Sequence, residues 1–205
     1  MTRLTIDDLS YRYPSGRLVI TGFSLDAEAE RLYLLRGPNG SGKTTLLSLV
    51  AGWLTPTRGH IALEGSLSYV PARLAFHDAL TVREELHYLA AAGALALDAL
   101  LTAALKWGFT DHELQQEISA LSTGWRQRLA LAIAGCGQPD IVLLDEPLAN
   151  LDSEAREMTI SWMQERLENG GVVMMASHDD DPDARVIETV MIPLGRPHEH
   201  AAAVA

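Results

Sequence analysis

Residues Gly37–Thr45 read Gly-Pro-Asn-Gly-Ser-Gly-Lys-Thr-Thr, and they follow closely on a short apolar run, Leu32–Leu35. This is the pattern G-x-x-x-x-G-K-[ST], placed between a predicted buried strand and an amphipathic helix that begins near Lys43. Glycines let the backbone turn tightly and aim several N–H groups into one concavity, where the helix dipole adds positive potential. The pattern therefore predicts a nucleoside-triphosphate site in an α/β fold.

Two polar residues of this loop have individual predicted roles. Lys43 can reach the β- and γ-phosphates, and Thr44 can offer its hydroxyl to Mg²⁺. The phosphates are expected to be held by the whole segment: Gly37, Pro38, Asn39, Gly40, Ser41, Gly42, Lys43, Thr44 and Thr45.

Composition narrows the class of protein. The chain has 205 residues, is 47% hydrophobic and carries a net charge of −11. It can build a substantial core, and it lacks the basic footprint of a nucleic-acid binder, so no nucleic-acid partner is expected. One cysteine, Cys136, excludes an internal disulfide. The N-terminus has no apolar signal core, and the apolar stretch Leu89–Leu105, interrupted by Gly93 and Asp98, is a poor membrane span. A cytoplasmic protein is expected.

The order of apolar segments predicts a mixed sheet, with antiparallel strands near the N-terminus and a parallel core. One domain, 1–205, is expected, with a helical lobe inserted at about 72–121 and a disordered tail at 196–205. Strands are predicted at 4–9, 18–25, 32–35, 60–63, 66–70, 141–144, 172–176 and 186–192. Helices are predicted at 43–51, 81–92, 94–107, 111–116, 124–134 and 153–168.

A second chemical signal comes at residues 141–147, which read Ile-Val-Leu-Leu-Asp-Glu-Pro. Four consecutive apolar residues are typical of a central parallel strand buried on both faces. Asp145 and Glu146 then stand at the carboxyl end of that strand, where α/β sheets hold their ligands. A phosphate-binding loop needs a carboxylate for Mg²⁺, and this strand supplies one.

Three further phrases complete the pattern: Leu-Ser-Thr-Gly at 121–124, Leu-Ala-Asn-Leu-Asp at 148–152 and Ser-His-Asp at 177–179. Each is a weak signal alone. In this order and spacing, together with the loop and the acidic strand end, they resemble the ATP-binding cassette (ABC) ATPase family. The resemblance runs from Leu4 to about Pro193.

The resemblance implies roles for individual residues. Asp145 would support Mg²⁺ with Thr44, and Glu146 would polarise the attacking water as general base. Tyr13 would stack on adenine, and His178 would contact the γ-phosphate and the attacking water. Ser122 and Gly124 would cap the γ-phosphate of a nucleotide held by a second cassette, and Asp152 would couple the two sites.

The resemblance also implies partners. It predicts a head-to-tail homodimer with two ATP molecules between the subunits, bound to integral membrane transporter subunits on the inner face of the cell membrane. The short chain is similar to the haem-exporter ATPase of cytochrome c maturation.

Two positions depart from the family pattern. Ala72 follows Tyr69-Val70-Pro71 where the family usually has Gln, and Ala72 can neither ligate Mg²⁺ nor position water. Thr123 and Trp125 replace the usual Gly and Gln of the 121–125 phrase. These changes bear on rate and coupling more than on ATP binding.

Three alternatives stay open. A soluble cassette ATPase acting on ribosomes or DNA usually has two cassettes or a coiled-coil insertion. A P-loop kinase would not need the Leu-Ser-Thr-Gly phrase. A degenerate cassette that binds ATP but turns it over slowly is favoured by Ala72 and opposed by Glu146 and His178.

Overall fold

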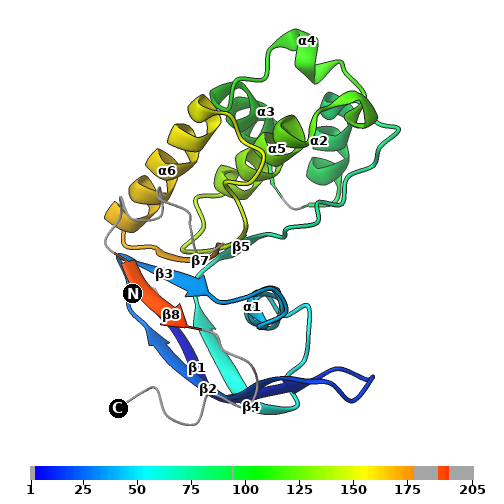
Figure 1. Ribbon diagram of the computed structural model, residues 1–205. Helices are drawn as coiled ribbons and strands as arrows, with labels where there is room; N and C mark the ends of the chain where they lie inside the picture. The colour runs from blue at the N-terminus through cyan, green and yellow to red at the C-terminus, as the bar shows by residue number, and fades with distance from the viewer. Residues whose placement is uncertain (1–2, 94, 178–188, 194–205) are drawn as a thin grey trace.

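A computed structural model describes residues 3–93, 95–177 and 189–193 (Figure 1). Its strands are β1 Arg3–Arg12, β2 Leu18–Ala27, β3 Arg31–Arg36, β4 Arg58–Glu64, β5 Leu67–Val70, β6 Ile141–Asp145, β7 Val172–Ala176 and β8 Thr189–Pro193. Its helices are α1 Lys43–Val50, α2 Val82–Ala91, α3 Leu97–Lys106, α4 Asp111–Leu114, the 3₁₀ turn η1 Ile118–Ala120, α5 Thr123–Cys136 and α6 Ser153–Glu168.

The antiparallel N-terminal strands and the parallel core are both present as predicted, but they form two sheets rather than one mixed sheet. An antiparallel sheet has the order β2-β1-β4, and a parallel sheet has the order β5-β6-β7-β3-β8. In the parallel sheet, Leu34 of β3 pairs with Met175 of β7, and Asp145 of β6 pairs with Ala176. The carboxyl ends of β3, β6 and β7 therefore meet at one edge, which is where the phosphate-binding loop and the acidic pair begin.

The two faces of the parallel sheet belong to two different cores. Leu34 and Leu144 point into a cluster that also contains residues of α5, α6 and the helical segment. Their chain neighbours Leu35 and Leu143 point into a second cluster, with α1 and the antiparallel strands. This alternation follows from the two-residue period of a strand. It explains why β6 and β7 are buried along their whole length.

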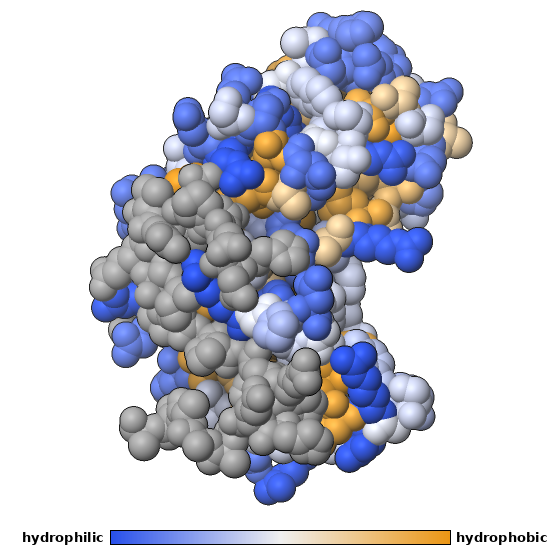
Figure 2. Space-filling model, viewed as in Figure 1, coloured by the Kyte–Doolittle hydropathy of each residue, from blue (hydrophilic) through white to orange (hydrophobic). Residues whose placement is uncertain are grey.

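The segment between β5 and β6 is helical (Figure 1). Thr81 starts α2 with a capping box: its hydroxyl accepts from the Glu84 N–H, and the Glu84 carboxylate accepts from the Thr81 N–H at 2.8 Å. Leu86 and Leu100 of this segment lie in the same cluster as Leu144 of the sheet. Side chains of these helices therefore pack in the same hydrophobic core as one face of the parallel sheet. In the space-filling view the surface is hollowed between these helices and the end of the molecule that carries α1 (Figure 2).

Some predicted boundaries move. The helix predicted at 94–107 begins at Leu97, because Ala96 has an extended backbone with ψ 138°. The helix predicted at 111–116 is the single turn α4, and the strand predicted at 186–192 is seen as β8, with residues 186–188 outside the described part. The predicted tail 196–205 also lies outside it. Within the described ranges, no helix is both long and apolar enough to cross a bilayer.

Candidate functional site

The loop between β3 and α1 has the backbone that its glycines predict. Gly40 has φ 80° and Gly42 has φ 105°, both in the left-handed region that other residues avoid. A Cβ atom on Gly42 would lie 3.0 Å from Cγ1 of Val19. The loop is therefore wrapped tightly against β2, with the N-terminus of α1 behind it.

A pocket of about 200 Å³ opens over this loop. Four residues from outside the loop share its lining: Tyr13, Arg17, Val19 and Glu146. From the loop itself come Asn39, Gly40, Ser41, Gly42, Lys43, Thr44 and Thr45. The structure thus brings Tyr13, most of the loop and Glu146 together, as the sequence predicts. Gly37 and Pro38 do not line the pocket, but their carbonyls accept hydrogen bonds from Lys43.

Lys43 is buried, at 6% exposure, although its ammonium is charged. Its Nζ donates to the Gly37 carbonyl at 2.6 Å and to the Pro38 carbonyl at 3.5 Å. A buried ammonium is costly unless it is paired or hydrogen-bonded, and two carbonyls are weaker partners than an anion. The ammonium is therefore poised for a phosphate in the pocket.

Two residues connect the β1–β2 turn to the loop. The Tyr13 hydroxyl lies 3.1 Å from the Thr45 hydroxyl, and the Arg17 guanidinium donates to the Gly40 carbonyl at 3.2 Å. Tyr13 also meets the ring of Tyr11 edge-on at 4.9 Å. The turn consequently places an exposed aromatic ring and a second cation at the rim of the pocket.

Asp145 ends β6 behind the loop, at 1% exposure. Burial raises the pKa of its carboxyl, while hydrogen bonds from the Thr44 hydroxyl and the Ala72 N–H, and the charge of Lys43, act in the opposite direction. Its Oδ2 makes no hydrogen bond to any described residue. A divalent cation would both satisfy this oxygen and offset the cost of the buried charge.

The donor set of a carboxylate and the Thr44 hydroxyl fits Mg²⁺, which binds to one or two protein groups plus substrate phosphates. The described residues hold no group of three His, Cys, Asp or Glu side chains that could bind a metal without such a substrate.

Glu146 follows Asp145 with φ 54°, a positive value that is strained for a non-glycine residue. Its N–H donates to the Ala176 carbonyl at 2.9 Å, so the backbone leaves the sheet directly after Asp145. The side chain is partly exposed and lines the pocket. The sharp turn directs two neighbouring carboxylates to different surroundings, one buried and one open to the pocket.

Ser122 and Gly124 lie elsewhere, at the start of α5, and neither lines this pocket. The Ser122 hydroxyl caps the helix by accepting from the Trp125 N–H at 3.3 Å. A Cβ atom on Gly124 would lie only 2.7 Å from the Asn150 carbonyl oxygen. Only glycine allows this approach between the start of α5 and the segment that precedes α6.

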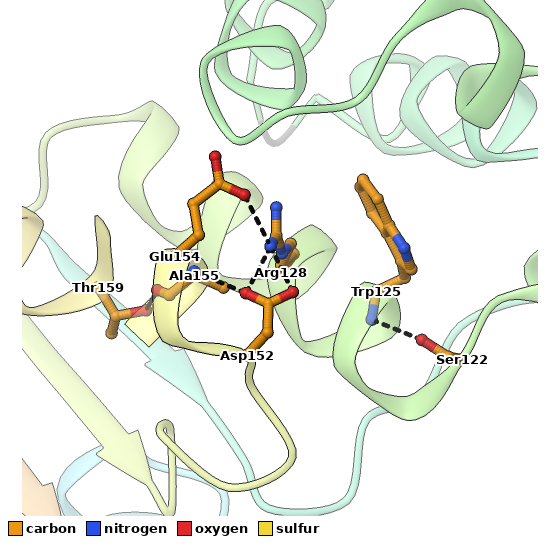
Figure 3. A network of polar contacts seen from close by, with 7 residues as sticks. All are labelled: Ser122, Trp125, Arg128, Asp152, Glu154, Ala155 and Thr159. Atoms are coloured by element: carbon orange, nitrogen blue, oxygen red, sulfur yellow. Dashed lines mark hydrogen bonds and ion pairs between the residues drawn. The ribbon is translucent and has the colours of Figure 1, made fainter. Parts of the chain in front are cut away.

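Asp152 caps α6 by accepting from the Ala155 N–H at 2.9 Å. Both of its carboxylate oxygens also lie 2.7 Å from Nη2 of Arg128 (Figure 3). The hydrogen bond from the Ala155 N–H holds the pKa of Asp152 below its usual value, and the hydrogen bond from Arg128 acts in the same direction with a smaller effect. Asp152 therefore stays ionised while it links α5 to α6.

His178, expected at the γ-phosphate, lies outside the described residues. Its neighbour Ser177 continues from β7 and donates its N–H to the Leu35 carbonyl at 3.4 Å.

Sequence reasoning missed three residues here. Val19 and Arg17 line the pocket, and Arg128 binds Asp152. Arg128 ends the stretch 121–128 that begins with the Leu-Ser-Thr-Gly phrase, but no role is predicted for it. Val19 and Arg17 stand in no such phrase, and Arg17 could be found only through the turn that places it four residues after Tyr13.

The comparisons with known proteins agree with this geometry. A family model described as ABC transporter matches residues 20–149. The chain is 34% identical to the zinc import ATP-binding protein ZnuC of Jannaschia sp. (strain CCS1), over 87% of this chain and 74% of the relative. It is 34% identical to the cytochrome c biogenesis ATP-binding export protein CcmA of Zymomonas mobilis, over 86% of this chain and 78% of the relative.

Solved structures share the fold. A dimeric post-hydrolysis ATP-binding cassette bound to ADP and Pi superposes with a TM-score of 0.83 at 20% identity, covering 94% of this chain and 96% of that one. The ATP-binding subunit of an ABC transporter superposes with a TM-score of 0.82 at 22% identity, covering 94% and 85%. With the family match spanning more than half of the sequence, and with an ATP-type phosphate loop facing Asp145 and Glu146, the chain belongs to the ABC transporter family, as an ATP-binding ATPase subunit.

Proposed function

We propose that this chain forms a head-to-tail homodimer that hydrolyses ATP and drives transport through separate integral membrane subunits, on the inner face of the cell membrane. The observation that carries the proposal is the pocket in which Lys43, Thr44 and Glu146 converge over the phosphate loop, with Asp145 behind it. We further propose that residues 1–205 form one ABC ATPase domain, with 72–121 as its helical subdomain and 196–205 as a disordered tail.

In this proposal each residue of the site has its own role in ATP binding or hydrolysis. Lys43 and the loop N–H groups bind and orient the phosphates, and Tyr13 stacks on the base. Asp145 and Thr44 hold Mg²⁺, which, when bound, neutralises charge on the phosphates. Glu146 takes a proton from the attacking water as general base. His178 contacts the γ-phosphate in this proposal.

Two features support a dimer. The pocket of about 200 Å³ is smaller than the roughly 300–1,000 Å³ usual for small-molecule sites, so one chain provides only part of the enclosure. Ser122 and Gly124 are away from it, at an exposed helix start, where they are free to cap a nucleotide held by a second copy. The dimeric cassettes with the same fold are consistent with this arrangement.

The relatives named for import and for export are about equally similar to this chain. Their shared feature is the ATP-binding subunit, and the similarity supports that role without assigning a cargo or a direction.

The proposal is tested with Glu146→Gln. The amide keeps the shape of the side chain but cannot act as a base, a loss typically worth about 10²–10⁴-fold in rate. We expect ATP to bind normally, turnover to fall by at least about 100-fold, and an ATP-dependent dimer to accumulate on size-exclusion chromatography. Phosphate release at the wild-type rate would show that Glu146 is not the base.

A further inference from the structure

The first turn of α5 carries an aromatic residue, Trp125, where the family pattern has Gln. Its ring stands edge-on to Phe109, with centroids 4.9 Å apart and an interplanar angle of 74°. The guanidinium carbon of Arg128 lies over the same indole ring, 4.9 Å from its centroid (Figure 3). The indole ring therefore contacts both an aromatic residue of the core and a cation.

Arg128 is almost completely covered, with 7% of its side chain exposed. Its Nη2 bonds to both oxygens of Asp152 at 2.7 Å and lies 3.5 Å from a Glu154 oxygen. A covered guanidinium needs partners for its charge, and here carboxylates meet its edge while the Trp125 ring covers its face. The ring thus limits where Arg128 can lie.

Arg128 joins two segments that carry predicted nucleotide contacts. Asp152 is the N-cap of α6 and ends the segment that starts at Glu146. Gly124 lies against the Asn150 carbonyl in the same segment. The start of α5 and residues 150–152 are therefore held together at two points, and one of these depends on Arg128.

We propose that Trp125 is a positioning residue that holds Arg128 on Asp152, and thereby fixes Ser122 and Gly124 for the nucleotide of a second subunit. The inference rests on the proposed dimer. A glutamine at this position has no aromatic face to cover the guanidinium. A cation–π contact at a desolvated site changes an equilibrium by about tenfold.

The competing explanation is that Trp125 only fills space against Phe109. Two variants separate these explanations. Trp125→Phe keeps an aromatic face for Arg128, while Trp125→Leu keeps an apolar side chain against Phe109 but has no such face. Trp53→Leu is the matched control, because Trp53 is 63% exposed and its ring contacts only Tyr69 among the described aromatic rings.

All variants are made in the Glu146→Gln background and measured in two ways. Titration of dilute protein with a fluorescent ATP analogue gives the ATP affinity of the monomer, and sedimentation with ATP gives the dimer dissociation constant. We expect Trp125→Leu to raise the dimer dissociation constant about tenfold with unchanged monomer ATP affinity. Trp125→Phe should stay within about threefold of the parent, and Trp53→Leu should match the parent. Equal effects of Leu and Phe would overturn the proposal, as would a loss of monomer ATP affinity in Trp125→Leu.

Amide hydrogen exchange of the ATP-free protein separates this inference from the proposed function. Trp125→Leu should speed exchange at residues 148–156, and Trp125→Phe should not. If the Glu146→Gln parent forms no ATP dimer, the proposed function fails, while faster exchange still supports the contact between Trp125 and Arg128. Unchanged exchange in Trp125→Leu overturns that contact whatever the dimer does.

Discussion

Adding one methyl group at Gly124 should disturb catalysis more than it disturbs folding. The new Cβ would lie 2.7 Å from the Asn150 carbonyl oxygen, so α5 and the 150–152 segment must separate by about 0.7 Å to reach ordinary contact. Gly124 has a helical backbone rather than a left-handed one, so alanine gains about 1 kcal/mol in helix propensity. Overpacking against a backbone atom costs about 1–3 kcal/mol. The net loss of stability is therefore about 0–2 kcal/mol, a few degrees in Tm.

We expect the substitution to affect the rate of phosphate release more strongly than it affects the stability of the fold. A misplacement of about 1 Å can cost about 100-fold, so a displacement of about 0.7 Å at Gly124 predicts roughly a 25-fold slower phosphate release at saturating ATP. The ATP affinity of the monomer should not change, because Gly124 does not line the pocket.

The matched control is Gly137→Ala, at the other end of the same helix, where the added methyl meets only the flexible end of Leu95 at 3.1 Å. Thermal unfolding, nucleotide titration and steady-state phosphate release are measured for both variants. If Gly124→Ala is as fast as Gly137→Ala, the close approach at Asn150 does not position the catalytic dimer.

Three other substitutions test the pocket. Lys43→Ala should weaken ATP binding about 10- to 100-fold in direct titration, because it removes a charged donor from the phosphates; unchanged affinity would refute the phosphate-loop assignment. Arg17→Gln should weaken ATP binding up to about fivefold, more at low than at high salt, because Arg17 is exposed, and an effect independent of salt would contradict a charge interaction. Ala72→Gln should raise the rate of phosphate release, since Ala72 bonds to Asp145 through its backbone and its methyl cannot position water; a variant no faster than wild type, with or without the membrane subunit, would show that position 72 does not limit the rate.

The sequence was sufficient where the chemistry is local. The turn from β3 through Gly42 into α1, and the burial of Asp145 at the end of β6, depend on residues that are adjacent in the chain and on the two-residue period of the strands. The antiparallel and parallel strands and most helices could be predicted on this basis, but not the division of the strands into two sheets.

The remaining features depend on distant pairs. Arg17 reaches the pocket because β1 and β2 pair, and Arg128 reaches Asp152 only after α5 and α6 have packed. Gly124 has no left-handed backbone, and its need for glycine comes from Asn150, 26 positions away. Such contacts leave no periodic or local signature, so a single sequence could not reveal them.

Arg128 has a counterpart two residues earlier: Nη2 of Arg126 lies 2.6 Å from Oδ1 of Asp78. Asp78 belongs to the loop that leaves β5, while Asp152 belongs to the loop that leaves β6, and these strands are hydrogen-bonded neighbours. The two loops thus start side by side at neighbouring strands. Each of them also bonds to an arginine of the same turn of α5, Asp78 to Arg126 and Asp152 to Arg128. A displacement of the loop after Ala72 is therefore expected to reach the residues around Asp152 through Arg126 and Arg128 of α5.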